Sequence, residues 1–234
     1  PVMDELTPRQ LLSTLVGFPT VSHRSNLDLV DWLEGYLAGH GIAAHRHWNE
    51  DRQKAALMAH AKARGCITTV DIFAGSAADL PDVDAVLPYT DYFIPSVEEA
   101  HALTGMTDLD AMAVFFMNRG ARACIFTLGG DGAYYRDRSG LTFRIPAFSI
   151  DVKCTCGCGD VFNAGFAAGL LNGMSPQDAV RLAQASSALN ATGLGSQAGV
   201  VSMEDTLAFM RQCEVYFRNC NYINYVQNFL LVAF

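Results

Sequence analysis

Between residues 7 and 41, apolar and polar positions alternate with the period of a helix. Apolar side chains recur every three or four positions, as on one face of an amphipathic helix. They form one stripe at Leu11, Leu12, Leu15 and Val16 and a second at Leu27, Val30, Leu33 and Leu37. Ser25 or Asn26 stands where the second helix needs a cap. We therefore predict two helices, followed by a short strand over 42-IAAHRHW-48.

From residue 53 onward, helix-like and strand-like segments alternate. Apolar and β-branched runs predict strands at 66–73, 91–96 and 122–129. A hairpin is predicted over 131–145, with its turn at Ser139-Gly140. Helical patterns, the first of them rich in alanine, occur at 54–64, 97–105, 109–120, 161–171, 176–192 and 203–210. This order of elements is typical of an α/β fold with a mainly parallel sheet.

Composition permits a large core and excludes several partners. The chain of 234 residues is 50% hydrophobic and 17% charged, enough for one large domain or a domain with an additional segment. The net charge is −8 and no Lys/Arg run occurs, so we expect no nucleic-acid partner, because phosphate binding requires clustered cations. No apolar run approaches the roughly 20 residues that span a bilayer, and residues 1–34 lack a signal-peptide pattern, so we expect no membrane partner.

Candidate chemistry is concentrated in the stretch 153-KCTCGCGDVFNAGF-166. Gly157 and Gly159 precede an apolar helix, and glycines allow successive backbone N–H groups to point outward together. The helix N-terminus adds about half a positive charge, so the turn is suited to bind a phosphoryl group. Asp160, in the first helical turn, should be ionised and could accept a proton from an attacking hydroxyl. An aspartate at this position is also an ordinary helix cap.

A metal site is the alternative interpretation of the cysteines. The chain has seven cysteines, an odd number that does not indicate a disulfide framework and favours a reducing cytoplasm. Cys154, Cys156 and Cys158 are spaced by one residue rather than by the two typical of zinc sites, so small thiols that fill a tight turn explain them better. His45 and His47 could share one face of a strand and bind a metal, although surface histidines are commoner.

Four motifs together resemble the PfkB, or ribokinase-like, family of carbohydrate kinases. Residues 154-CTCGCGD-160 resemble its signature Asp-Thr-Thr-Gly-Ala-Gly-Asp, and 127-TLGGDG-132 resembles its nucleotide loop. Its Asn-x-x-Glu motif is resembled by 96-SVEE-99. Its segment that flanks adenine and a monovalent cation is resembled by 184-QASSALNATGLGSQAG-199. The four occur in family order, and the resemblance covers about residues 55–212. Taken alone, TLGGDG also fits a hairpin turn and Glu99 a solvated helix face.

The resemblance implies a ribokinase-like three-layer α/β/α fold, truncated at its N-terminal side, and ATP-dependent phosphorylation of a small sugar. Asp160 would be the base, with the anion hole at Gly157, Cys158 and Gly159. Glu99 would help to hold Mg²⁺. The remaining ATP and cation contacts would come from Thr127, Gly129, Gly130, Gly132, Gln184, Asn190, Gly195 and Gly199. Cys154 replaces an Asp of the family, which puts dependence on a monovalent cation such as K⁺ in doubt, and Ser96 replaces an Asn.

The N-terminal part differs from the family, whose Gly-Gly substrate motif and lid strands are not seen. Residues 6–55 instead resemble the beginning of acetylornithine deacetylase, although its metal ligands lie beyond this segment and its His-x-Asp motif is absent. We therefore divide the chain into residues 1–54, a kinase-like part at 55–212 and a tail at 213–234. The tail is uncharged from Asn219 to Phe234 and, with a truncated sheet, favours self-association into a homo-oligomer.

Three functional hypotheses remain open on the sequence. The first is an ATP-dependent sugar kinase that uses Asp160 as base. The second is a nucleotide-binding protein with little turnover, because the sugar-binding half of the family is not seen. The third is a deacetylase-type hydrolase, which would require a metal centre.

Overall fold

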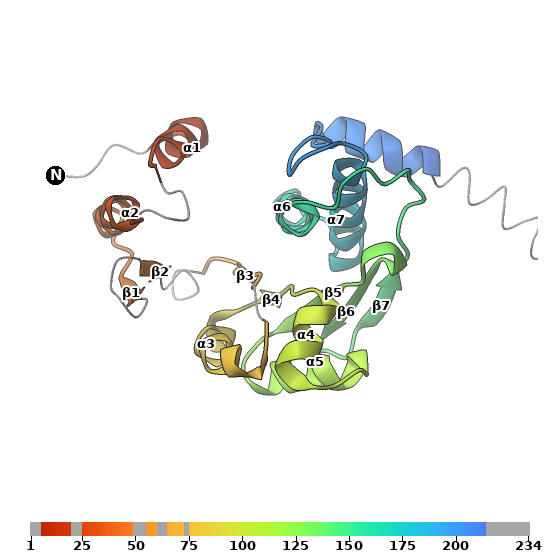
Figure 1. The fold of residues 1–234 in the computed structure, drawn as a ribbon, viewed down its shortest axis with the longest axis horizontal. Helices are drawn as coiled ribbons and strands as arrows, with labels where there is room; N and C mark the ends of the chain where they lie inside the picture. The colour runs from red at the N-terminus through yellow and green to blue at the C-terminus, as the bar shows by residue number, and fades with distance from the viewer. Residues whose placement is uncertain (1–5, 20–24, 49–54, 60–64, 73–74, 214–234) are drawn as a thin grey trace, which may run out of the picture. The chain divides into compact units, whose positions relative to one another are not determined.

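A computed structural model describes residues 6–19, 25–48, 55–59, 65–72 and 75–213 of the chain. Two compact units can be distinguished, Pro1–Thr68 and Thr69–Phe234. Figure 1 labels the helices and strands of both units. The aromatic tail from residue 214 onward, with its predicted self-association, lies outside the described residues. Within the described ranges, no helix is long and apolar enough to cross a membrane.

The first unit begins with the two predicted helices, which are confirmed as α1 (Pro8–Val16) and α2 (Leu27–Gly39). A capping box starts α1: the Gln10 N–H donates to Thr7 Oγ1 at 3.4 Å, and the Thr7 N–H donates to Gln10 Oε1 at 3.0 Å. On α2 the Trp32 ring stacks on Tyr36 with centroids 5.3 Å apart. The spacing of four residues places both rings on one helix face.

Two strands complete the first unit, and one of them corrects a sequence prediction. The strand β1 (Ala44–Trp48) was expected, but residues 55–59 of the predicted alanine-rich helix 54–64 form β2 (Ala55–Ala59). All five residues of β2 pair antiparallel with β1, from Ala44↔Ala59 to Trp48↔Ala55. The backbone N–H and C=O groups of β1 require hydrogen-bond partners, and β2 supplies them. This pairing outweighs the helix propensity of alanine. The side chains of His45 and His47 lie outside the described set.

The second unit is built on a mixed sheet. In the part of the chain that the structure describes, five strands lie in the order β3-β4-β5-β6-β7. Their bounds are Thr69–Val70, Tyr92–Phe93, Ala123–Thr127, Ala133–Asp137 and Thr142–Ile145. The pairs β3–β4 and β4–β5 are parallel, whereas β5–β6 and β6–β7 are antiparallel. The sheet is therefore mixed rather than mainly parallel, because the predicted hairpin, which is confirmed as β6 and β7, extends the same sheet.

Helices cover both faces of this sheet, as Figure 1 shows. On one face lie α4 (Val97–Thr104) and α5 (Leu109–Asn118), and on the other α6 (Cys158–Leu171) and α7 (Pro176–Ala191). Successive strand residues point to opposite faces, so Phe93, Cys124, Phe126 and Tyr134 enter the first core. Ile94, Ile125, Ala133 and Tyr135 enter the second. The result is the three-layer α/β/α arrangement that the sequence resemblance implied.

Two further helical segments flank these layers. The short helix α3 (Leu80–Val86), which the sequence pattern did not predict, contributes Val83 to the first core. The predicted helix at 203–210 is confirmed over residues 203–213. Its Phe209 packs against Phe148, with ring centroids 5.2 Å apart. This last helix closes a third, smaller core over α7.

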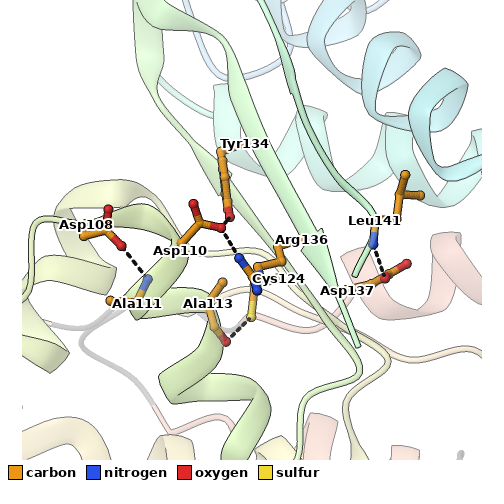
Figure 2. Close-up of polar contacts among 9 residues, drawn as sticks. All are labelled: Asp108, Asp110, Ala111, Ala113, Cys124, Tyr134, Arg136, Asp137 and Leu141. Atoms are coloured by element: carbon orange, nitrogen blue, oxygen red, sulfur yellow. Dashed lines mark hydrogen bonds and ion pairs between the residues drawn. The ribbon is translucent and has the colours of Figure 1, made fainter. Parts of the chain in front are cut away.

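Polar contacts fasten α5 to the sheet (Figure 2). The Tyr134 hydroxyl donates to Asp110 Oδ1 at 2.6 Å, and the guanidinium of Arg136 pairs with the same oxygen. These two donors hold the pKa of the Asp110 carboxyl below its ordinary value. The Cys124 thiol donates to the Ala113 carbonyl at 3.7 Å. Because α5 packs on β5 and β6, these contacts fix the strand that ends at Thr127.

We predict that Tyr134→Phe lowers the free energy of unfolding by about 1 kcal/mol, the net worth of one hydrogen bond to a charged acceptor in a part-exposed position. Urea denaturation measures this loss. The control is a double-mutant cycle: in an Asp110→Ala background, where the acceptor is gone, the same substitution should cost much less. Equal losses in both backgrounds would contradict the role of this hydrogen bond.

Candidate active site

A cleft of about 500 Å³ opens where segments distant in sequence meet. Its walls come from the residues after β3 and β4, from the end of β5, and from the turn before α6 and the first residues of α6. The lining side chains and backbone belong to Asp71, Ile72, Ile94, Ser96, Glu99, Thr127, Thr155, Gly157, Cys158, Gly159, Asp160 and Asn163. The carboxyl ends of parallel strands meet at one edge of a sheet, which is where α/β proteins bind ligands.

The turn before α6 has a conformation that only glycine adopts easily. Gly157 has φ 70° and ψ 6°, in the left-handed region. A Cβ atom on it would lie 2.5 Å from the Ser196 carbonyl oxygen. With Gly157 as the N-cap, α6 begins at Cys158, three residues before the predicted start at Val161. The sequence offered no side-chain cap as a signal for this earlier start.

The amides at the start of α6 are unequal. The Cys158 N–H donates to the Thr155 carbonyl at 3.2 Å and is therefore engaged within the turn. The N–H groups of Gly159 and Asp160 have no hydrogen-bond partner among the residues that the structure describes. These two amides, at the positive end of the helix dipole, are the ones that can bind an anion in the cleft.

Asp160 is the third residue of α6, is exposed and lines the cleft. The helix has no side-chain cap, so the capping alternative for this aspartate is not observed. Within the described ranges, no donor forms a hydrogen bond with its carboxylate. A carboxylate that faces a cleft without such a donor can accept a proton from a bound hydroxyl group.

Glu99 belongs both to the cleft and to a helix cap. Its Oε2 accepts from the Ser96 N–H at 2.8 Å and from the Ser96 hydroxyl at 2.7 Å, while Ser96 caps the Glu99 N–H at 3.2 Å. This reciprocal capping box fixes the carboxylate at the start of α4. The alternative of a purely solvated helix face is therefore wrong, because the carboxylate also lines the cleft.

Sequence reasoning missed a further carboxylate, Asp71, which follows β3. Asn163 of α6 donates to Asp71 Oδ2 at 2.9 Å, and the Ile72 N–H donates to Oδ1 at 2.8 Å. Burial raises the pKa of Asp71 to about 6, and the nearby charges of Glu99 and Asp160 act in the same direction. Its signal in the sequence is a single carboxylate near the end of the apolar run 66-CITTVDIF-73.

The loop 127-TLGGDG-132 reaches the cleft only through its first residue. Thr127 lines the cleft, whereas Gly129 and Gly130 are exposed in a short 3-10 turn that connects β5 to β6. The Leu128 N–H donates to the Gly132 carbonyl at 2.8 Å. The hairpin-turn interpretation of this loop is therefore confirmed, and it coexists with a position at the edge of the cleft.

The predicted residues from 184 to 199 are not among the residues that line the cleft. Asn190 is buried and joins two loops: its Nδ2 donates to the Cys156 carbonyl at 3.0 Å, and its Oδ1 accepts from the Gly199 N–H at 3.4 Å. Gly195 has φ 114°. Gln184 is buried within α7. The two hydrogen bonds of the Asn190 side chain therefore connect the turn before α6 to Gly199 and hold this turn in place.

Metal ligands are not preassembled. In the described ranges, no group of three or more His, Cys, Asp or Glu side chains is arranged to hold a metal ion. The three-cysteine zinc alternative therefore has no support from the structure. The cleft carboxylates Asp71, Glu99 and Asp160 are oxygen donors of the kind that Mg²⁺ prefers, and Mg²⁺ commonly completes its coordination with substrate phosphates and waters.

Comparison with known proteins agrees with this architecture. Residues 49–203 match the pfkB family of carbohydrate kinases. A ribokinase from Haemophilus influenzae is 32% identical over 132 residues, which are 54% of this chain and 43% of the relative. A 2-dehydro-3-deoxygluconokinase from Bacillus subtilis is 31% identical over 120 residues, or 51% and 37% of the two chains. The chain thus spans less than half the length of these relatives.

Solved structures show the same fold. A ribokinase from Thermotoga maritima superposes with a TM-score of 0.57 at 21% identity, over 80% of this chain and 79% of the other. An Arabidopsis thaliana ribokinase in complex with ribose and ATP gives 0.58 at 22% identity, over 64% and 49%. The second unit therefore has the ribokinase-like fold. The comparisons do not support the resemblance of residues 6–55 to acetylornithine deacetylase.

We predict that Gly132→Ala destabilises the protein by about 3 kcal/mol or more, because the added Cβ would meet backbone at a strained φ. At this position, where φ is 97°, the Cβ would lie 1.9 Å from the Ile145 carbonyl oxygen. Gly129→Ala is the matched control: φ is 56° and nothing lies within 4 Å. It should cost only about 1 kcal/mol. Similar losses in urea denaturation would contradict the close backbone approach at Gly132.

We predict that Asp71→Asn changes the pH dependence of stability. The pKa of Asp71 is raised from 3.8 to about 6 in the folded state, so its ionisation weakens folding as pH rises through this window. The variant cannot ionise there and should gain about 1 kcal/mol relative to the wild type between pH 4 and 7, an amount discounted for partial exposure. Urea denaturation at several pH values measures it, and a difference that does not change with pH would contradict the raised pKa.

Proposed function

Because this chain belongs to the PfkB family of carbohydrate kinases, we propose that it transfers the γ-phosphoryl group of ATP to a hydroxyl of a small sugar. The observation that carries this proposal is the convergence in one cleft of Asp160, Glu99 and Thr127, which come from three separate motifs. A carboxylate beside a helix N-terminus supplies both requirements of phosphoryl transfer, a proton acceptor and a site for negative charge.

The phosphoryl group is proposed to bind against the N-terminus of α6. The N–H groups of Gly159 and Asp160 belong to the first turn of α6, where N–H groups have no acceptor within the helix. Gly159 has no side chain that would block access to them. Phosphoryl transfer depends mainly on positioning and on charge stabilisation, which preorganised amides provide without reorganisation. The engaged Cys158 amide would stabilise the turn rather than contact the phosphate.

Asp160 is proposed as the base. The sugar hydroxyl would lie between its carboxylate and the phosphoryl group, transfer its proton to a carboxylate oxygen, and attack phosphorus as the bond to the leaving oxygen of ADP breaks. No donor from the described residues competes for the carboxylate. The base therefore remains available to the incoming hydroxyl.

A divalent cation fits the charge of the cleft. Its described lining contains Asp71, Glu99 and Asp160 and no lysine or arginine. The phosphates of ATP would be repelled by these carboxylates unless a cation came with them. Mg²⁺, when bound, would neutralise charge on the phosphates, and Glu99 and Asp71 are proposed to hold it and its waters. An Escherichia coli protein assigned as a ribokinase II was solved with ATP and Mg²⁺, which supports the same ligands here.

We propose no monovalent-cation site at the Asn190 side chain. Its amide nitrogen donates a hydrogen bond to the Cys156 carbonyl, and its amide oxygen accepts one from the Gly199 N–H. Cys154 stands where the family commonly has an aspartate, and a thiol is a poor ligand for K⁺. Phosphoryl transfer is therefore expected to depend on Mg²⁺ and to vary little between Na⁺ and K⁺ salts.

We predict that Asp160→Asn lowers phosphoryl transfer by about 10²–10⁴-fold, the usual contribution of a general base. Transfer from Mg-ATP to a panel of pentoses and hexoses is measured as ADP release and as sugar phosphate formed. Calorimetry should show that the variant still binds Mg-ATP, because the amides that hold the phosphate are unchanged.

The control is Asp82→Asn, an exposed aspartate of α3 outside the cleft, which should retain the activity of the wild type. Undiminished transfer by Asp160→Asn would overturn the assignment of the base. If the wild type binds Mg-ATP but phosphorylates no sugar, the nucleotide-binding hypothesis replaces the kinase. If neither binding nor transfer occurs, both hypotheses fail.

A further inference from the structure

Two accessible thiols lie side by side at the edge of the candidate active site. Cys154 is partly exposed and Cys156 is exposed, and both are free. The third thiol of the turn, Cys158, points instead toward α7, with its Sγ 3.6 Å from the Ser187 carbonyl and 3.8 Å from Asn190 Nδ2. The turn therefore presents one pair of thiols to solvent and keeps the third against a helix.

Hydrogen bonds make the two exposed thiols chemically unequal. The Cys156 N–H donates to Cys154 Sγ at 3.4 Å, so the Cys154 side chain folds over the following peptides. The nearby Cys156 thiol and the Gly195 backbone, together with this N–H, lower the pKa of the Cys154 thiol. The interaction of the Cys156 thiol with the Cys154 side chain raises the pKa of Cys156. The backbone N–H at Cys154 Sγ stabilises its thiolate, so Cys154 is the thiol that attacks first and Cys156 the one positioned to react second.

The thiol pair is joined directly to the anion-binding turn. Thr155, between the two cysteines, and Gly157, after them, both line the cleft. The Lys153 and Cys154 N–H groups donate to the Ala191 carbonyl at 2.7 and 3.2 Å, which holds the beginning of the turn. A bond between the two sulfurs would close a small ring around Thr155 while the turn remains held at its beginning. The ring would therefore displace the peptides that lead into α6.

We propose that Cys154 and Cys156 form a reversible dithiol–disulfide site that weakens phosphate binding at the α6 N-terminus when it is oxidised. The oxidant is a low-molecular-weight disulfide, of the class of oxidised glutathione. The effect on nucleotide affinity rests on the proposed kinase function, whereas formation of the disulfide does not.

The reaction proceeds by two thiol–disulfide exchanges. The Cys154 thiolate attacks one sulfur of the small disulfide, forms a mixed disulfide and releases one small thiolate. Cys156 then loses its proton and attacks the Cys154 sulfur, which forms the Cys154–Cys156 bond and releases the second small thiolate. Two protein thiols are oxidised, one small disulfide is reduced to two thiols, and the two protein protons end on the released thiolates.

The first test maps the thiols of the full chain after equilibration with mixtures of reduced and oxidised glutathione. Free thiols are alkylated and the peptides are analysed by mass spectrometry. We expect a Cys154–Cys156 disulfide, recognised by the loss of two hydrogens, at ratios where the exposed Cys66 shows at most a glutathione adduct. Cys156→Ser should stop at a glutathione adduct on Cys154. A persistent Cys154 adduct in the wild type, or a bond from either thiol to Cys158, would overturn the proposal.

The second test compares the reduced and oxidised chains by calorimetry with Mg-ATP. Oxidation should weaken binding by about tenfold or more, comparable to loss of one charge-assisted hydrogen bond, and dithiothreitol should restore it. Cys66→Ser should respond as the wild type does. A double variant, Cys154→Ser with Cys156→Ser, can form neither the disulfide nor a glutathione adduct at the turn and should not respond. A disulfide that leaves the affinity unchanged would overturn the proposal. If the reduced chain binds no Mg-ATP, the kinase function fails. In that case amide hydrogen exchange is compared between the reduced and oxidised chains, and oxidation should change the protection of residues 155–160. Unchanged protection there would overturn the proposed redox site.

Discussion

The geometry of the site depends on the close contact between Gly157 and the backbone of Ser196. A side chain at Gly157 would meet the Ser196 carbonyl oxygen at 2.5 Å. Without one, the turn takes a left-handed conformation and α6 starts directly at Cys158. Asn190 holds the neighbouring residues, because its side-chain amide donates to the Cys156 carbonyl and accepts from the Gly199 N–H. The free amides, the direction of Asp160 and the approach of the two exposed thiols all follow from this arrangement.

The electrostatics of the cleft are a balance between this helix N-terminus and three carboxylates. The helix end favours an anion, whereas Asp71, Glu99 and Asp160 repel one. Burial, with a smaller contribution from the nearby charges of Glu99 and Asp160, raises the pKa of Asp71. A nucleotide that binds together with a divalent cation would place negative phosphate against the helix N-terminus and positive metal against the carboxylates.

Local signals explain which elements could be predicted. The capping box of Ser96 and Glu99 marks the start of α4, and Gly105, at φ 68°, marks its end. The Ser139-Gly140 turn likewise identifies the hairpin. Residues 55–59 were misassigned because their alanines favour a helix in isolation, whereas pairing with β1 decides their conformation in the fold. Asp71 was overlooked because its partners, Asn163 and the other two carboxylates, are distant in the chain.

Patterns among residues a few positions apart were sufficient to predict the alternation of helices and strands and to mark Asp160 as the candidate base. The order of four such motifs along the chain indicated the family. Long-range contacts decided the rest. The Gly157–Ser196 approach selects which amides face the cleft, and the strand ends bring Asp71 and Glu99 beside Asp160. The Asn190 side chain joins the turn before α6 to Gly199. Such contacts arise from the path of the backbone through space, which no local pattern of residue types records.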